Sequence, residues 1–184
     1  MVFTPDTRLS LAAVVNLVNT LPGYDDPDRL QTIDDLDAFL LVNPYTGAIR
    51  RTREAVSELR DVRVRLRALW DVDRIGAVPL VNEMLRDSGA LPQLVIHDSY
   101  DWHIHATSDD APLATRILAE GAMAFVDVIR SDEYDRVRVC SADDCDAVYI
   151  DYSRNGSKRY CDTGNCGNRM NVNAYRARKA RETV

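Results

Sequence analysis

Two short stretches decide how the last part of the chain folds: Cys140-Ser-Ala-Asp-Asp-Cys145 and Cys161-Asp-Thr-Gly-Asn-Cys166. They contain all four cysteines of the 184 residues, in two pairs with the spacing C-x4-C-x15-C-x4-C. Paired cysteines are typical of a structural zinc site, in which four thiolates surround the metal as a tetrahedron. We therefore predict that Cys140, Cys145, Cys161 and Cys166 bind one Zn2+ ion.

Two other interpretations of the four cysteines are two disulfide bonds and four unrelated buried thiols. Two disulfide bonds would need an oxidising compartment. We expect a cytoplasmic protein instead, because no run of about 18 apolar residues could span a membrane and the apolar stretch 9–21 lacks a cleavage site. Four unrelated buried thiols would not be expected to fall into two close pairs.

A shell of four thiolates leaves no position for a catalytic water, and no other catalytic motif stands out, so we expect no enzymatic activity.

The residues between the two cysteine pairs have the pattern of a β-hairpin. Residues 148–153 alternate like a strand, Asn155-Gly156 is a common two-residue turn, and residues 157–160 would return as the second strand. Cys166 then begins a helix that we expect to reach about Arg181. This order of knuckle, hairpin and helix predicts a small treble-clef or ribbon-like zinc finger at residues 136–184, called the finger below.

The residues before the finger are mainly helical in pattern. We expect helices at 32–41, where Thr32 begins a capping signal, at 48–73, at 79–86 and at 109–129, where residues 109–112 would form the first turn. Residues 94–97 and 102–106 are short β-like runs around a turn at 98–101, which predicts a hairpin. A polar link at 131–135 marks the boundary. The predicted fold class is therefore α+β: a mainly helical domain with a β-hairpin at residues 1–135, called the body below, followed by the finger.

Charge is distributed unevenly along the chain. The net charge is −6, but the body carries 13 basic and 23 acidic residues, whereas the finger carries 10 basic and 6 acidic residues. From Arg154 onward the basic residues outnumber the acidic ones by eight to two. An acidic body joined to a basic segment predicts that only the finger meets a polyanion such as DNA.

Two motifs make the sequence resemble a known family. Cys166-Gly-Asn-Arg169 is similar to the signature of the CGNR zinc finger, together with Asp151-x-Ser153-Arg154 and the basic helix. The body resembles the ABATE domain, through Val18-Asn19-Thr20 after an apolar run and through its later hairpin. Tyr160 replaces a tryptophan of the family, and Met170-Asn171 stands where a small residue and lysine are common. The resemblance implies a bacterial transcription regulator whose finger is the DNA-binding part.

The basic residues of the finger form the candidate nucleic-acid surface. Arg and Asn side chains match guanine and adenine edges in the major groove, and they recur on one face of the expected helix. Other cations could hold phosphates. The predicted contacts are Arg154, Lys158 and Arg159 on the hairpin, and Arg169, Asn173, Arg176, Arg178, Lys179 and Arg181 on the helix. Met170, Ala174 and Ala177 would pack on the hairpin. Two alternatives stay open: a solvated basic helix end, and an Arg169 that bonds back across the finger.

The leading hypothesis is a cytoplasmic transcription regulator that binds DNA through the finger, while the body senses a small ligand or a protein partner. The alternatives are a protein-interaction adaptor, in which the zinc site only folds the finger, and a thiol redox switch, in which oxidation ejects zinc from its structural site. Asn16, Asn19 and Thr20 either line a ligand pocket or close a helix end. His103 and His105 either bind a metal or, as we favour, alternate on a solvent-facing hairpin. The sequence does not indicate the oligomeric state.

Overall fold

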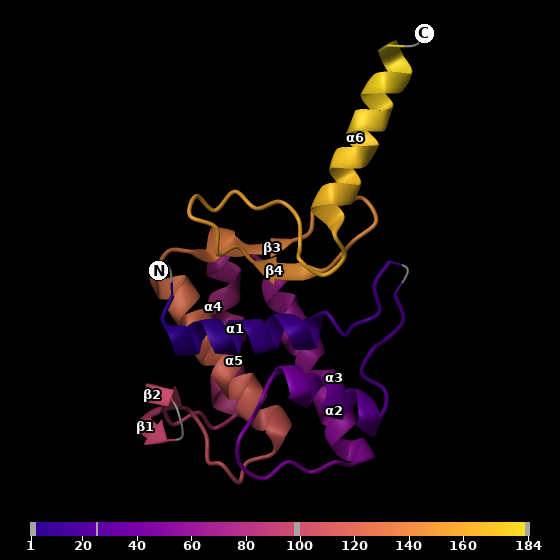
Figure 1. Ribbon diagram of the computed structural model, residues 1–184. Helices are drawn as coiled ribbons and strands as arrows, with labels where there is room; N and C mark the ends of the chain where they lie inside the picture. Colours follow the sequence, from indigo (N-terminus) through magenta and orange to yellow (C-terminus); the bar gives the residue numbers. More distant parts are fainter. Residues whose placement is uncertain (1–2, 25, 98–99, 183–184) are drawn as a thin grey trace.

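The computed structural model describes residues 3–24, 26–97 and 100–182 and shows the elements of both parts (Figure 1). The helices are α1 (Pro5–Val18), α2 (Ile33–Val42), α3 (Arg53–Arg67), α4 (Arg74–Asp87), α5 (Leu113–Arg130) and α6 (Cys166–Glu182), with short 3-10 helices η1 (Ala68–Trp70) and η2 (Tyr134–Arg136). The strands are β1 (Gln93–His97), β2 (Tyr100–His105), β3 (Val137–Val139) and β4 (Val148–Ile150). The predicted α+β fold is confirmed. Within the described ranges, no helix is long and apolar enough to cross a membrane.

Helix α5 is the centre of the body and packs against α1, α3 and α4. Its side chains Ile117 and Phe125 are fully buried. Gly121 lies where α1 comes closest, because a β-carbon at this position would be only 2.8 Å from Cγ2 of Val14. The apolar helix expected at 109–129 is present, but it begins only at Leu113, because Pro112 is its N-cap and residues 109–112 precede it.

Side-chain caps decide where the shorter helices begin. Thr32 accepts a hydrogen bond from the Asp35 backbone N–H while the Asp35 carboxylate accepts one from the Thr32 N–H, so the predicted capping signal of α2 is confirmed. The helix expected from residue 48 begins only at Arg53, because Thr52 caps it by accepting from the Ala55 N–H. The segment before Thr52 is an irregular connection rather than a helical turn.

The helix expected at 79–86 begins five residues earlier than predicted. Asp73 is the N-cap of α4, and its carboxylate accepts a hydrogen bond from the Gly76 N–H at 2.8 Å. Pro79 therefore lies inside the helix, where its missing N–H removes one backbone hydrogen bond. Proline was expected in the first turn, but the aspartate cap decided the position of the first turn instead.

Strands β1 and β2 form the hairpin that the sequence predicts. They pair antiparallel with Leu94 opposite Ile104 and Gln93 opposite His105. The turn predicted at 98–101 includes residues 98 and 99, which lie outside the described residues. Leu94 and Ile104 are exposed, so this hairpin lies at the surface of the body.

The finger contains a different hairpin from the one predicted. Strand β4 pairs with β3, with Val137 opposite Ile150, and residues 157–160 are not a strand. Asn155-Gly156 does form a turn, in which Gly156 has a φ of 58°. The return segment is held by a side chain, because the Asp151 carboxylate accepts hydrogen bonds from backbone N–H groups at both ends of the loop.

Strand β4 also packs against the body. Val148 and Ile150 are buried and belong to the same core cluster as the helices of the body. The Trp70 indole N–H donates to the Tyr149 carbonyl at 3.3 Å, and α1 contacts β4 along one side. Figure 1 shows α1 crossing between the strands of the finger and α5. The body and the finger therefore share one continuous core.

Candidate metal centre and basic helix

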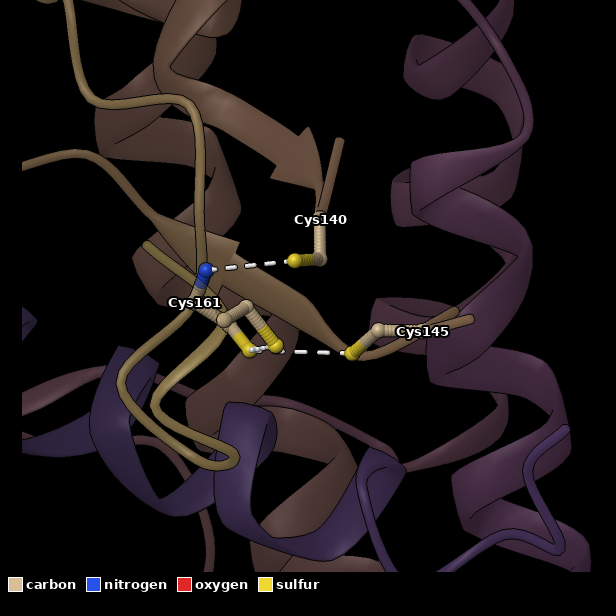
Figure 2. Close-up of side chains that lie close together, drawn as sticks. Cys140, Cys145 and Cys161 are labelled. Atoms are coloured by element: carbon tan, nitrogen blue, oxygen red, sulfur yellow. Dashed lines mark hydrogen bonds between the residues drawn. The ribbon is translucent and has the colours of Figure 1, made fainter. Parts of the chain in front are cut away.

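The four cysteines meet at one point of the finger. Their Sγ atoms all lie within 4.8 Å of one another, and two of the separations, Cys145 to Cys161 and Cys161 to Cys166, are 3.7 Å. Figure 2 shows the sulfur atoms of Cys140, Cys145 and Cys161 turned toward one another. All four side chains are free thiols rather than disulfides.

These distances fit a tetrahedral metal ion. A Zn–S bond of about 2.3 Å places the corners of a tetrahedron about 3.8 Å apart, close to the observed 3.7 Å. A disulfide would require about 2.05 Å, and four unrelated thiols would have no reason to converge. The donor set therefore fits a metal ion that prefers thiolates.

Three of the cysteines are positioned by different local features of the backbone. Cys140 directly follows β3, and its N–H donates to the Ala147 carbonyl, which extends the β3–β4 ladder by one step. Cys145 lies in a tight turn closed by a bond from its own N–H to the Ala142 carbonyl. Cys166 is the first residue of α6 and is fully buried. The knuckle and the first turn of α6 thus bring ligands from both cysteine pairs to one point.

The surroundings of Cys161 favour a thiolate. Its burial disfavours the charged form, but the backbone N–H groups of Thr163 and Gly164 donate to the sulfur, and the pKa of Cys161 falls to about 7. Burial raises the pKa of Cys145 and of Cys166, and the sulfur atom of Cys161 adds to the effect at both. A divalent cation among them would offset this mutual repulsion.

Arg169 belongs to the metal centre rather than to a free basic surface. Its guanidinium group donates to the Cys166 sulfur at 3.3 Å and to the Asp144 carboxylate at 2.7 Å. Asp144 comes from the first cysteine pair and Cys166 from the second, so Arg169 connects the two halves of the site. The positive charge beside a thiolate also offsets part of the negative charge of a four-thiolate complex.

Asp151 organises the loop that leads to Cys161. Its fully buried carboxylate accepts hydrogen bonds from the backbone N–H groups of Ser153 and Lys158, both at 2.8 Å. Burial raises its pKa, but these hydrogen bonds outweigh burial and keep the pKa of Asp151 below its usual range. Arg136 donates to the carbonyls of Asp151 and Ser153. The Asp151-x-Ser153 motif thus has a structural role.

The other predicted DNA contacts are placed in two groups. Arg154 and Arg159 are exposed on the loop, with the Arg159 guanidinium 5.7 Å from the centre of the Tyr160 ring, whereas Lys158 is paired with Asp162. The remaining predicted residues lie on α6: Asn173, Arg176, Arg178 and Lys179 are exposed there, and Arg181 is in its last turn. Helix α6 points away from the body (Figure 1).

One expectation about α6 is wrong. Met170 does pack beside the cysteine cluster, but Ala174 and Ala177 are exposed rather than packed on the hairpin. The helix leaves the finger after its first turn, because the cysteine cluster offers an apolar surface only near Cys166. Ten consecutive residues, 171–180, are exposed.

Sequence reasoning missed two residues of this site. Asp144 looked like one of several acidic residues near the cysteines, and only its position between Cys140 and Cys145 could have suggested a role. Asn19 ends α1, which is one of its two predicted roles, but the sequence did not indicate that its side chain also binds both polar backbone groups of Val148. That contact depends on the three-dimensional packing of α1 against β4.

Two family models match the chain, in the order that the sequence predicts. Residues 136–179 match the CGNR zinc finger. Residues 11–132 match the ABATE family, which is described as "Putative stress-induced transcription regulator". A search of curated proteins finds no match. The resemblance drawn from the short motifs is thus confirmed.

Proposed function

Because the chain belongs to the ABATE family and carries a CGNR zinc finger, we propose that it is a transcription regulator that binds duplex DNA through the finger. The observation that carries this proposal is α6, a basic helix that leaves the metal centre and is exposed on all sides over residues 171–180. A helix of its 17 residues is about 25 Å long. The major groove of B-DNA is wide enough to admit an α-helix.

The energetics of α6 support a partner. Isolated helices of about 15 residues are marginal in water, and only the first turn of α6 packs against the rest of the finger. Residues 154–184 carry eight basic and two acidic side chains, whereas the body carries a net charge of −10. A polyanion would therefore be attracted to α6 and repelled by the body.

The metal has a structural role in this proposal, and we infer that it is Zn2+. Four thiolates fill a tetrahedral shell and leave no position for a catalytic water, so the proposal includes no enzymatic activity. The ion would fix the first residue of α6, Cys166, to the knuckle formed by Cys140 and Cys145. Free thiols persist in a reducing compartment, which is consistent with a cytoplasmic regulator.

The second part of the proposal concerns the body, which would sense a small ligand. Strand β4 of the finger is packed into the core of the body, so a change in α1 reaches the finger directly.

The adaptor alternative is favoured by one observation: Val172 and Tyr175 are 46% and 58% exposed on α6, and exposed apolar side chains one turn apart can bind a protein groove.

The test is a salt titration of the full metal-loaded chain on random and on selected DNA duplexes. The logarithm of the affinity should fall with the logarithm of the salt concentration by roughly 0.9 for each phosphate that is neutralised. Arg178→Ala should weaken binding to all sequences and lower the slope by about one. Arg176→Ala should also relax sequence preference, by about 1–3 kcal/mol.

Arg86→Ala is the matched control, because Arg86 is an exposed arginine on α4 of the body. It should leave both affinity and slope unchanged. Absence of binding by the metal-loaded chain at about 50 mM salt, where phosphate contacts are strong, would contradict the proposal. Loss of binding with Arg86→Ala as large as with Arg178→Ala would contradict the assignment to α6.

A further inference from the structure

A cavity of about 400 Å³ lies in the body, away from the metal centre. It is open to solvent on one side and is lined by α1, the end of α2 with the segment that follows it, strand β2 and α5. Its volume falls in the range of about 300–1,000 Å³ that is usual for small-molecule sites. Leu9, Val42 and Trp102 supply apolar surface on different sides of it.

The polar side of the cavity contains groups that the protein leaves unpaired. Glu120 of α5 lines the cavity, and its carboxyl group makes no hydrogen bond or ion pair with any residue that the structure describes. The same holds, over the same described ranges, for the Tyr45 hydroxyl group, whose pKa is raised by burial and by the nearby Glu120. Partly buried polar groups of this kind are usually satisfied by a partner.

The charges of the residues that line the cavity favour a positively charged ligand. Among the described residues around the cavity, Asp6 and Glu120 are carboxylic acids and none is lysine or arginine. A positive charge on His105 would be offset by Asp109, whose carboxylate lies 3.3 Å from Nδ1 of that ring, and the Nε2 atoms of His103 and His105 are 3.1 Å apart. A hydrogen bond at this distance needs one bare nitrogen, so at least one of the two rings is neutral.

We propose that this cavity binds a small amphipathic amine, whose ammonium group pairs with the Glu120 carboxylate while its apolar part contacts Leu9, Val42 and Trp102. Binding of the amine is argued from the cavity alone; its use as a regulatory signal rests on the proposed sensing role of the body. An ammonium group supplies the hydrogen-bond donors that an unpaired carboxylate lacks. An aromatic or aliphatic body fits the apolar wall, and an exposed Trp102 ring can also face a cation.

The position of Glu120 makes its ionisation sensitive to such a ligand. Burial raises the pKa of Glu120 to about 7, Asp109 adds to this effect, and Arg116 opposes it. A bound ammonium group would favour the ionised form, so binding of an amine should strengthen as the pH rises from about 6 to 8. Asp6, Tyr45, His103 and His105 also line the cavity, and the comparison with Glu120→Gln separates their contribution.

The experiment titrates the full chain, without DNA, with 2-phenylethylamine, its homologues of longer chain, and simple alkylamines. The neutral analogue 2-phenylethanol and the anionic analogue 3-phenylpropanoate carry the same ring. Calorimetry and the fluorescence of Trp102 report binding, since the other tryptophan, Trp70, is buried in the core. At least one amine should bind with saturation, at least tenfold more tightly than the alcohol, and the anion should bind less than either.

Glu120→Gln keeps the shape of the side chain and should weaken binding of the amine at least tenfold and remove the part of its pH dependence that Glu120 contributes. Glu83→Gln, an exposed carboxyl on α4, is the matched control and should change neither. Circular dichroism and the melting temperature show whether the variants are folded. The proposal is overturned if no amine binds up to about 10 mM, a weak-affinity limit, if the anion binds best, or if Glu120→Gln binds amines as the parent does. Because no DNA is present, these outcomes do not depend on the DNA titration.

Discussion

The Asn19 side chain binds both polar backbone groups of Val148, a residue 129 positions later in the chain. Its Oδ1 atom accepts from the Val148 N–H at 2.8 Å, and its Nδ2 group donates to the Val148 carbonyl at 2.9 Å. Asn19 closes α1 in the body, and Val148 begins β4 in the finger. One amide side chain thus replaces a neighbouring strand along the open side of β4.

Asn19→Ala should therefore destabilise the whole protein. Each backbone group left without a partner costs about 1–3 kcal/mol when buried, so we expect the free energy of unfolding to fall by about 2 kcal/mol or more. Chemical denaturation of the metal-loaded chain measures this change. Asn82→Ala, on the exposed face of α4, should stay within about 0.5 kcal/mol of the parent. Equal effects of the two substitutions would contradict the role of Asn19.

Removal of the metal should affect the body as well as the finger. Cys161→Ser takes away one ligand, and β4, which the metal site supports, is part of the common core. Because 1 kcal/mol shifts the melting temperature of a chain of this size by about 2–4 °C, we expect a single transition lowered by more than about 10 °C. Native mass spectrometry and calorimetry provide the test, and Ser157→Ala is the control. A second, unchanged transition would mean that the body is independent of the finger.

Arg169 and Arg176 should have different effects although both lie on α6. Arg169→Ala removes the hydrogen bonds to the Cys166 sulfur and to Asp144, so metal affinity should fall by about 10–100-fold. Arg176→Ala should leave metal affinity unchanged, because Arg176 is exposed beyond the first turn of the helix. Competition with a chromogenic chelator measures both affinities. If Arg176→Ala releases metal as readily, the assignment of Arg169 to the centre is wrong.

The stability of the protein should depend on pH through Glu120. Its pKa is raised to about 7 by burial, opposed by Arg116 and supported by Asp109, whereas an unfolded glutamate has a pKa of about 4.3. The folded state therefore binds more protons between these values. Its contribution to stability is complete below about pH 4 and is lost as the pH rises through about 7. Glu120→Gln should raise the melting temperature relative to the parent at pH 8 but not at pH 4.5; Tyr45, Asp6, His103 and His105 remain in both proteins. An equal difference in melting temperature at pH 8 and at pH 4.5 would contradict this role of Glu120.

Local signals were sufficient where a helix is fixed by its own residues. The capping box of Thr32 and the apolar pattern of α5 each lie within one element, so both helices could be predicted. The paired spacing was likewise enough to select four cysteines that the structure brings together. In each case the interacting atoms belong to neighbouring turns or to one short finger.

Long-range contacts decided what the sequence did not indicate. Asn155-Gly156 predicted a ladder between residues 148–153 and 157–160, but the Asp151 carboxylate accepts from the Lys158 N–H of the return segment, and β3 pairs with β4 instead. The partner of Arg169 is Asp144, 25 positions away. The cavity around Glu120 needs α1, β2 and α5 to pack together, and no local pattern encodes such a volume.

The shared core also sets an order of events during synthesis. A ribosome adds about 5–20 residues per second, and Val148 is made 129 residues after Asn19, so roughly 6 to 26 seconds separate the two. During that interval the flank of α1 that β4 will cover is bare, and α5 can already pack on its other side. The nascent chain thus exposes an apolar surface of α1 for a limited time. A chaperone that covers this surface would have to dissociate before β4 can pack there.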